Sequence, residues 1–248
     1  MQKSWPLPFT IAHRGASQLA PENTLAALKL AKQQGATWVE SDIQLTQDRH
    51  PVIFHDTTLN RTTNGKGKLS DITLSKLSLL DAGSWFSVKF KNERVPTLQE
   101  WLRCAADLTV GLNLEVKCST KKEAILLAEC IIDHLQKYWL AHANTIFISS
   151  SSQFALMQIS ERANSLPLGL ICEKKITEKE AVALLRSNII SIHQPYKILD
   201  EKYVALLHAA GLHVLAYTVN TSQGVEKLKS INVDGIFTDA VSCYPCAK

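Results

Sequence analysis

Short apolar runs alternate with amphipathic stretches along most of the chain, and this alternation predicts its fold. The short runs suit buried strands, whereas the longer stretches repeat apolar residues at helical spacing. Strands are predicted over residues 9–13, 38–43, 111–116, 145–149, 168–172, 189–193, 213–217 and 234–238. Helices are predicted over residues 23–34, 97–106, 122–137, 153–162, 177–185, 200–210 and 222–230. Eight strands that alternate with helices indicate an α/β protein, specifically a TIM (β/α)8 barrel.

Several predicted helices carry recognisable end signals. Asn23 or Thr24 follows Pro21 and is the candidate N-cap of the first helix, because short polar side chains bond the free N–H groups there. Gly35 and Gly211 follow the first and sixth helices, and glycine readily adopts the left-handed backbone at which many helices end. These signals support the predicted helix boundaries.

The alternation breaks between Val52 and Val95. A short apolar run within VIFHD is followed by polar, glycine-containing sequence and then by the aromatic motif DAGSWF. We interpret about residues 56–95 as an insertion after the second strand, on the loop face of the barrel. Because the catalytic groups of such barrels gather at that face, we expect the insertion to cap or line the site.

Length and composition agree with one soluble enzyme domain over residues 1–248, rather than two small ones. Apolar residues make up 46% and charged residues 20%, and the net charge of +4 comes from scattered Lys and Arg, which argues against nucleic acid as a partner. Residues 1–10 show no export signal, and no apolar run reaches the about 20 residues of a bilayer span. We therefore expect a cytoplasmic protein without integral membrane association.

The six cysteines do not indicate a metal or redox site. Cys243 and Cys246 form a CYPC pair, but zinc-binding spacing and a thioredoxin-like context are both missing from the sequence. A surface thiol pair without a catalytic role is the better interpretation. Four others lie in apolar segments and are expected to behave as small core residues: Cys104, Cys118, Cys130 and Cys172.

Carboxylates cluster on two predicted strands. Side chains alternate along a strand, so Glu40 and Asp42 share one face, and Glu115 and Lys117 share a face of the next barrel strand. We expect these polar faces to point into the barrel and the apolar faces to meet the helices. Three carboxylates at one mouth repel each other unless a cation neutralises them. A hard divalent ion, Mg²⁺ or Ca²⁺, suits such oxygen ligands.

Nearby cationic residues allow a second interpretation. The acids could instead form salt bridges with Lys117, Arg14 or Arg94, because buried charges require partners of some kind. Arg14 and Lys117 also suit a phosphate group, since a guanidinium can grip two oxygens at once. The sequence alone does not decide between the two interpretations.

Two histidines are the candidate acid/base pair. His13 ends the first predicted strand, at the barrel mouth. If residues 47–50 form the turn of a hairpin, antiparallel pairing sets His55 opposite Asp42, beside the carboxylates. One imidazole can then take a proton from a nucleophile while the other protonates a leaving group. The combination with a metal and cationic residues favours phosphoryl transfer.

The remaining histidines are weaker candidates. His193 and Tyr217 end predicted strands and could reach the mouth, but core packing or loop anchoring fits them equally well. The others in turn or helix positions are expected to be solvated or to cap: His50, His134, His142 and His208.

At these residues the sequence resembles the glycerophosphodiester phosphodiesterase family, which has a barrel of the phospholipase-C-like phosphodiesterase type. The ordered motifs cover nearly the whole chain, and the missing export signal resembles the bacterial cytoplasmic form. They are AHRGA (12–16), APENT (20–24), ESD (40–42), FHDTTLNRTTNGKG (54–67), DAGSWF (81–86), VPTLQE (95–100), LEVK (114–117), YTVN (217–220) and DGIFTD (234–239).

The resemblance implies a specific reaction. A free hydroxyl of the substrate's glycerol attacks phosphorus, expels an alcohol and forms a cyclic phosphate, which water then opens to glycerol 3-phosphate. The alcohol would be choline, ethanolamine or glycerol. Carried over, His13 and His55 exchange acid and base roles between the steps. Glu40, Asp42 and Glu115 bind the metal, while Arg14, Lys117 and Tyr217 bind the substrate.

Two departures from the family pattern and two alternative functions stay open. Tyr217 stands where many members have Trp, and Ser41 where a bulkier apolar residue is common. A barrel that binds glycerol phosphate esters without turnover, or a lyase that stops at the cyclic phosphate, would share the fold. The preferred alcohol, the metal and the oligomeric state, a homodimer included, are not determined by the sequence.

Overall fold

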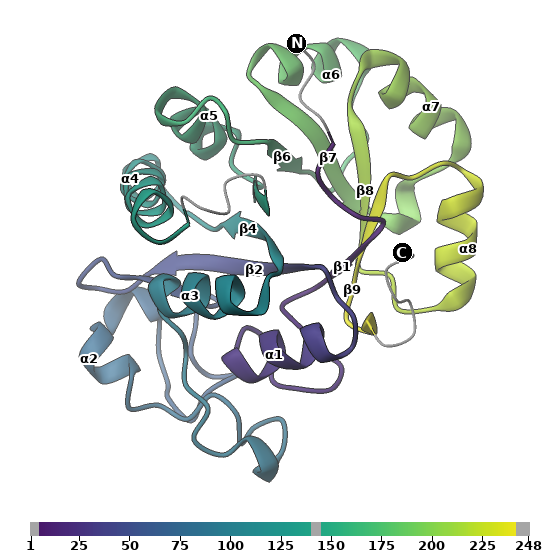
Figure 1. The fold of residues 1–248 in the computed structure, drawn as a ribbon. Helices are drawn as coiled ribbons and strands as arrows, with labels where there is room; N and C mark the ends of the chain where they lie inside the picture. Colours follow the sequence, from purple (N-terminus) through teal and green to yellow (C-terminus); the bar gives the residue numbers. More distant parts are fainter. Residues whose placement is uncertain (1–4, 140–144, 242–248) are drawn as a thin grey trace.

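The computed structural model describes residues 5–139 and 145–241. Within these residues, eight parallel strands close into a barrel through the pairing of β1 with β2, and the helices surround it (Figure 1). The TIM barrel prediction is confirmed. The barrel strands are β1 Thr10–Ala12, β2 Trp38–Leu45, β4 Gly111–Val116, β5 Ile146–Ser150, β6 Leu168–Ile171, β7 Ile189–Pro195, β8 His213–Tyr217 and β9 Gly235–Thr238, and β3 Pro51–Ile53 pairs antiparallel on the outside of β2.

The helices begin where the sequence offers short polar caps. Thr24, not Asn23, caps the first helix, because Asn23 adopts a left-handed backbone (φ 57°) and directs its side chain to Asp42 instead. Gly211 ends α7 in the left-handed conformation, as predicted. The helices are α1 Leu25–Gln33, α2 Leu74–Leu77, α3 Leu98–Leu108, α4 Lys121–Tyr138, α5 Gln153–Arg162, α6 Glu178–Arg186, α7 Glu201–Ala210 and α8 Ser222–Ser230, with 3-10 turns η1 Leu69–Asp71, η2 Val88–Phe90 and η4 Tyr196–Ile198.

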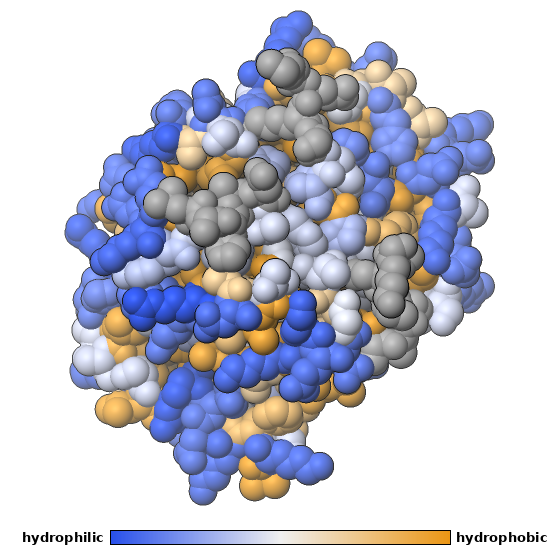
Figure 2. Space-filling model, in the orientation of Figure 1, coloured by the Kyte–Doolittle hydropathy of each residue, from blue (hydrophilic) through white to orange (hydrophobic). Residues whose placement is uncertain are grey.

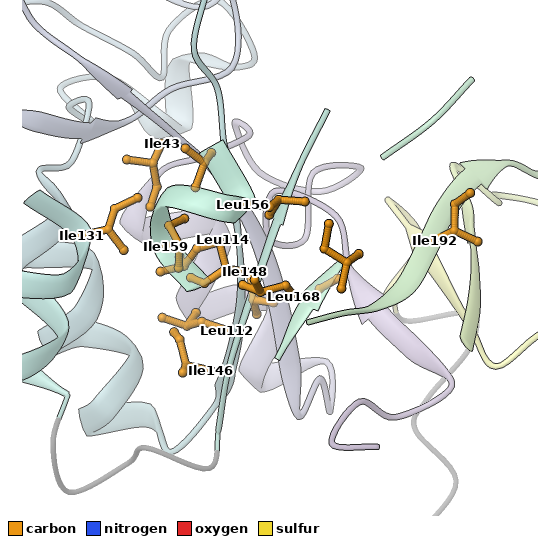
Figure 3. Packing of buried hydrophobic residues seen from close by; sticks show 14 of the residues in the cluster. Ile43, Leu112, Leu114, Ile131, Ile146, Ile148, Leu156, Ile159, Leu168 and Ile192 are labelled. Carbon is orange, nitrogen blue, oxygen red and sulfur yellow. The ribbon is translucent and has the colours of Figure 1, made fainter. Parts of the chain in front are cut away.

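The apolar core has two layers that follow from strand alternation. Outward-facing residues such as Ile43 and Leu114 pack against Ile131 of α4 and Ile159 of α5 (Figure 3). A second layer of large side chains fills the barrel interior: Leu7, Ile11, Trp38, Phe147, Leu215 and Phe237. The strand face that carries Trp38, Glu40 and Asp42 therefore points inward, as predicted. The barrel is a filled scaffold that supports a polar mouth.

The hairpin after β2 has a different register from the predicted one. Ile43 pairs with Ile53, and the Phe54 N–H bonds the Asp42 carbonyl at 2.9 Å, so Phe54, not His55, lies opposite Asp42. The turn is one residue shorter than expected, because the Thr46 N–H bonds the His50 carbonyl at 3.0 Å and Arg49 adopts the left-handed conformation (φ 63°). His55 follows the hairpin and still reaches the mouth of the barrel.

The inserted segment 56–95 lies mainly beside the barrel. Its apolar side chains, among them Leu59, Leu69 and Leu77, pack with Val52 and Phe54 in a small separate core. Figure 1 shows this segment, with α2, projecting from the side of the molecule. The expectation that it caps or lines the site is wrong for most of its length, because its apolar residues are buried on the outer hairpin and not at the mouth.

Figure 2 shows hydrophilic side chains over much of the face drawn, with apolar ones scattered between them. In the part of the chain that the structure describes, no helix combines the length and the apolar character of a bilayer span. The four cysteines in apolar segments pack, partly buried, against the main core as predicted, whereas Cys243, Cys246 and His142 lie outside the described residues.

Candidate active site

A cavity of about 530 Å³ opens at the carboxyl ends of the barrel strands. Asp42 is fully buried, and its carboxylate lies within 4.8 Å of those of Glu40 and Glu115, which reach the cavity. The barrel thus gathers nearly all the predicted site residues at the face where such enzymes carry their active sites. Those lining the cavity are His13, Arg14, Glu40, His55, Glu115, Lys117 and Tyr217.

The three acids form one cluster because β2 and β4 are neighbours. The strand register sets Asp42 beside Glu115, and Glu40 points to the same interior face. Burial, followed by the charges of Asp42 and Glu115, raises the pKa of Glu40 well above its usual range. Burial and the charge of Asp42 likewise raise the pKa of Glu115. Burial and the neighbouring carboxylates therefore disfavour the charged forms of Glu40 and Glu115.

Two cationic side chains contact this cluster. Arg14 Nε lies 3.3 Å from Asp42 Oδ2, and Lys117 Nζ lies 2.8 Å from Glu115 Oε1 and 3.4 Å from Asp42 Oδ1. Burial favours the neutral form of Asp42, but the charges of Arg14 and Lys117 outweigh it and lower the pKa of Asp42. Arg94, the third predicted salt-bridge partner, is not part of the cluster and donates to the Leu80 carbonyl at 2.9 Å.

The salt bridges do not saturate the acids. Glu40 Oε1 and Asp42 Oδ1 are buried and accept no hydrogen bond from the described residues. Three carboxylates that each offer an oxygen within 4.8 Å of the others are a donor set that a hard divalent cation prefers. The residues therefore fit a metal ion, in addition to the two cationic side chains.

The His13 ring is held by a carboxylate that the sequence analysis missed. His13 Nδ1 lies 2.7 Å from Asp239 Oδ1, and its Nε2 lies 3.9 Å from Glu40. Asp239 also accepts from Ser17 Oγ at 2.8 Å and from Asn220 Nδ2 at 2.7 Å. Burial opposes its ionisation, but the hydrogen bond and charge of His13, with the bonds from Asn220 and Ser17, lower the pKa of Asp239 to about 2. Its Nδ1 contact leaves the His13 Nε2 directed toward the acid cluster.

His55 has an equivalent partner. Its Nδ1 lies 2.7 Å from Oδ1 of the adjacent Asp56, whose side chain is also gripped by Arg61. Sequence reasoning missed Asp56 and Arg61 as well, although both belong to the FHDTTLNRTTNGKG motif. The motif is the available signal, but it does not reveal that the Asp56 carboxylate turns back onto the preceding imidazole.

His193 of β7 and Tyr217 of β8 also line the cavity. His193 is 1% exposed, bonds Ser191 Oγ through Nε2 at 3.0 Å, and burial lowers its pKa to about 3. It reaches the cavity, as one of its two interpretations proposed, but as a neutral ring packed against Phe147 and Phe237. Burial, with the nearby carboxylates of Glu173 and Glu115, raises the pKa of Tyr217 to about 12. Tyr217 therefore offers a neutral hydroxyl.

The remaining described histidines make their contacts outside the cavity. His50 is largely exposed, and His134 Nδ1 bonds the Cys130 carbonyl within its helix. His208 and His213 both bond the Asp234 carboxylate, at 2.7 and 3.0 Å, at the amino end of β9. These rings lie apart from the cavity, as expected for His50, His134 and His208.

A polar cavity with carboxylates, imidazoles and cations at the carboxyl ends of a closed parallel barrel defines an α/β-barrel enzyme. Comparison with known proteins identifies the family of this enzyme. Residues 13–242 match the model of the glycerophosphoryl diester phosphodiesterase family. The chain belongs to this family, and it is accordingly a phosphoric diester hydrolase.

Individual relatives agree with this assignment. The chain is 36% identical over 235 residues to the glycerophosphodiester phosphodiesterase of Caldanaerobacter subterraneus subsp. tengcongensis, covering 93% of both proteins. It superposes on an Oleispira antarctica phosphodiesterase, solved in complex with the product sn-glycerol-3-phosphate, with a TM-score of 0.91 and 35% identity, over 96% of this chain and 95% of that one. The chain also superposes on the glycerophosphodiester phosphodiesterase of Agrobacterium tumefaciens with a TM-score of 0.81. The sequence identity is 26%, and the match covers 97% of this chain and 100% of that one.

Proposed function

We propose that this enzyme hydrolyses glycerophosphodiesters to sn-glycerol 3-phosphate and an alcohol, using His13 and His55 as proton-transfer groups and a divalent metal ion. The observation that carries the proposal is the convergence of both imidazoles, the acid cluster and two cations on one cavity. The product named for the Oleispira antarctica relative supports glycerol 3-phosphate as the common product.

Each histidine is assigned a proton transfer in both steps. In the first step, one imidazole removes the proton from the glycerol hydroxyl that attacks phosphorus, and the other protonates the departing alcohol oxygen as its P–O bond breaks. The product is a cyclic glycerol phosphate. In the second step the roles reverse: water loses a proton as it attacks phosphorus, and the ring P–O bond breaks with protonation of the glycerol oxygen. Asp239 and Asp56, each at an Nδ1, support this assignment by aiming the Nε2 atoms.

The cationic side chains would hold the phosphate. Lys117 and Arg14 line the cavity, and both retain their charge because nearby carboxylates raise their pKa values against the effect of burial. Tyr217 would contact the glycerol or the alcohol through its neutral hydroxyl. The leaving alcohol would sit toward the exposed Glu173 and Lys174 side of the cavity.

Glu40, Asp42 and Glu115 would hold the metal, with Mg²⁺ or Ca²⁺ favoured by their hard oxygen donors. When bound there, such an ion would make the attacking hydroxyl more acidic and would offset the charge on the phosphate. Glu40 Oε1, which is buried and accepts no hydrogen bond from the described residues, supports this assignment.

The test is turnover of glycerophosphocholine by the purified protein, with glycerol 3-phosphate measured enzymatically. Activity should be lost on treatment with EDTA and return on addition of Mg²⁺ or Ca²⁺. Full activity at saturating chelator would reject the metal. Phosphorus NMR of the reaction distinguishes the complete hydrolase from a lyase, because a cyclic phosphate that accumulates and persists would contradict the second step.

A further inference from the structure

Arg61, in the inserted segment, donates hydrogen bonds to two carboxylates at the same time. Its Nε and Nη2 lie 2.7 and 2.8 Å from the two oxygens of Asp56, and its Nη1 and Nη2 lie 2.6 and 2.8 Å from the two oxygens of Glu22. Every guanidinium nitrogen is therefore used in a double fork. This geometry is among the strongest arrangements of charged hydrogen bonds.

Each carboxylate in turn holds a side chain of the cavity. Asp56 Oδ1 lies 2.7 Å from His55 Nδ1, and Glu22 Oε1 lies 2.7 Å from Arg14 Nη1. The chain of contacts His55–Asp56–Arg61–Glu22–Arg14 thus links one proposed proton-transfer group to one proposed phosphate-binding group. Arg61 itself does not line the cavity.

The network also joins separate segments of the chain. Glu22 belongs to the loop after β1, whereas Asp56 and Arg61 follow β3, and the Glu22–Arg61 contact spans 39 residues. Glu22 and Asp56 are mostly shielded from solvent, with side chains 13% and 22% exposed, although Arg61 is 45% exposed. Isolated exposed ion pairs contribute little to stability, so a double fork at this place is better explained by the side chains it fixes.

We propose that Arg61 is a positioning residue: it fixes the His55 imidazole through Asp56 and the Arg14 guanidinium through Glu22. The inference rests on the proposed function, because it assigns those two groups to the reaction. It gives the inserted segment a role at the site without contact with the substrate. The role depends on the planar fork of arginine, which the point charge of lysine cannot reproduce.

Kinetics of Arg61→Met and Arg61→Lys test the proposal with glycerophosphocholine. We expect kcat of Arg61→Met to fall about 10- to 100-fold in the folded variant, which is the range for groups that orient catalytic side chains. Arg61→Lys should stay within about threefold of Arg61→Met, because charge without the fork is insufficient. The matched control is Arg162→Met. Arg162 donates to Glu129 at 3.1 Å and does not line the cavity, so its loss should leave kcat unchanged.

A second readout needs no turnover. Nitrogen NMR of histidine-labelled protein reports the ring tautomer of His55, which a charged Asp56 holds with the proton on Nδ1. In Arg61→Met this signal should move toward a mixture of tautomers, while the rings of His208 and His213, bonded to Asp234, stay unchanged. Glu22→Gln, which leaves the Asp56 arm in place, should raise KM through Arg14 and leave the His55 signal nearly unchanged.

The outcomes separate the two proposals. If the wild type fails to turn over glycerophosphocholine, the proposed function fails, and the His55 signal still tests the positioning. Wild-type kcat in Arg61→Lys, or an unchanged His55 ring in a folded Arg61→Met, overturns the inference. If Arg61→Met does not fold, Arg61→Lys and Glu22→Gln decide it by the same two measurements.

Discussion

Asp239→Asn tests whether a carboxylate at the end of the last strand serves the imidazole at the end of the first. Asparagine has the shape of a protonated aspartic acid but no charge, so it removes what the ionised form contributes. The pKa of Asp239 lies at about 2 instead of the ordinary 3.8. At about 1.4 kcal/mol for each pKa unit, the native contacts of the charged group contribute about 2 kcal/mol to the free energy of unfolding.

The sign of this contribution follows from the lowered pKa. The stabilisation is complete above the ordinary pKa of the group and is lost as the pH falls through about 2. At neutral pH the variant should therefore unfold with about 2 kcal/mol less free energy, which lowers the melting temperature by about 4–8 °C for a chain of this size.

Activity should fall far more than stability. Without the carboxylate at Nδ1, the His13 ring can carry its proton on Nε2, and Nε2 can then no longer accept a proton from the substrate. The loss of an acid/base group typically lowers the rate about 100- to 10,000-fold. We expect kcat for glycerophosphocholine to decrease at least about 100-fold, with a smaller change in KM. The assay is steady-state release of glycerol 3-phosphate, next to urea unfolding followed by circular dichroism.

The matched control is Asp234→Asn. Asp234 also accepts from two imidazoles, His208 and His213, and the hydrogen bonds that it receives outweigh burial and lower its pKa. It lies apart from the cavity, so its loss should reduce stability without reducing kcat. A kcat for Asp239→Asn within twofold of the wild type, or an equal loss in Asp234→Asn, would refute the reasoning.

Three further predictions follow from the same geometry. His13→Ala and His55→Ala should each lower kcat about 100-fold or more, and a loss below tenfold in either variant would exclude it from proton transfer. Glu115→Gln should weaken the binding of Mg²⁺ or Ca²⁺, measured by calorimetry, by more than about 10-fold, because residues that only support a metal ligand already cost about that much. An unchanged affinity would show that Glu115 is not a ligand. The pKa of His193 lies at about 3 in the folded state, compared with the ordinary 6.5. Acidification from pH 7 to pH 5 should therefore lower the free energy of unfolding of the wild type by about 2 kcal/mol, a loss that a folded His193→Gln variant should not show. Parallel urea-unfolding curves for the two proteins across this range would contradict the burial of His193 as a neutral ring.

The fold could be predicted because its main signal is local. Strands such as β2 and β4 carry apolar residues on the helix-facing side and polar residues inside, so alternation alone placed Glu40 and Asp42 at the interior face. Each interpretation of the acid cluster has support, since Arg14 and Lys117 contact it, whereas Glu40 Oε1 accepts no hydrogen bond from the described residues. Neighbouring strands then brought Glu115 to the same point.

Details that depend on turn length or on distant contacts could not be predicted. The hairpin register was wrong by one residue because no local rule required Arg49 to adopt a left-handed backbone and close the turn at His50. Asp239 was missed because its contact with His13 joins positions 226 residues apart and exists only when β9 pairs with β1. Arg61 was missed for a similar reason, since its two forks become visible only when the inserted segment lies against the loop after β1.

The pairing of β1 with β9 has a consequence for biosynthesis. The His13 N–H bonds the Thr238 carbonyl at 2.9 Å, and the seam between the two strands is made by the earliest and latest barrel elements to leave the ribosome. Local βα units can form as they emerge, but this long-range closure waits until the last strand is synthesised. A nascent chain would therefore hold most of its secondary structure while His13 still lacks Asp239. Catalytic competence should appear abruptly once β9 has been synthesised, and nascent chains without β9 should lack activity toward phosphodiesters.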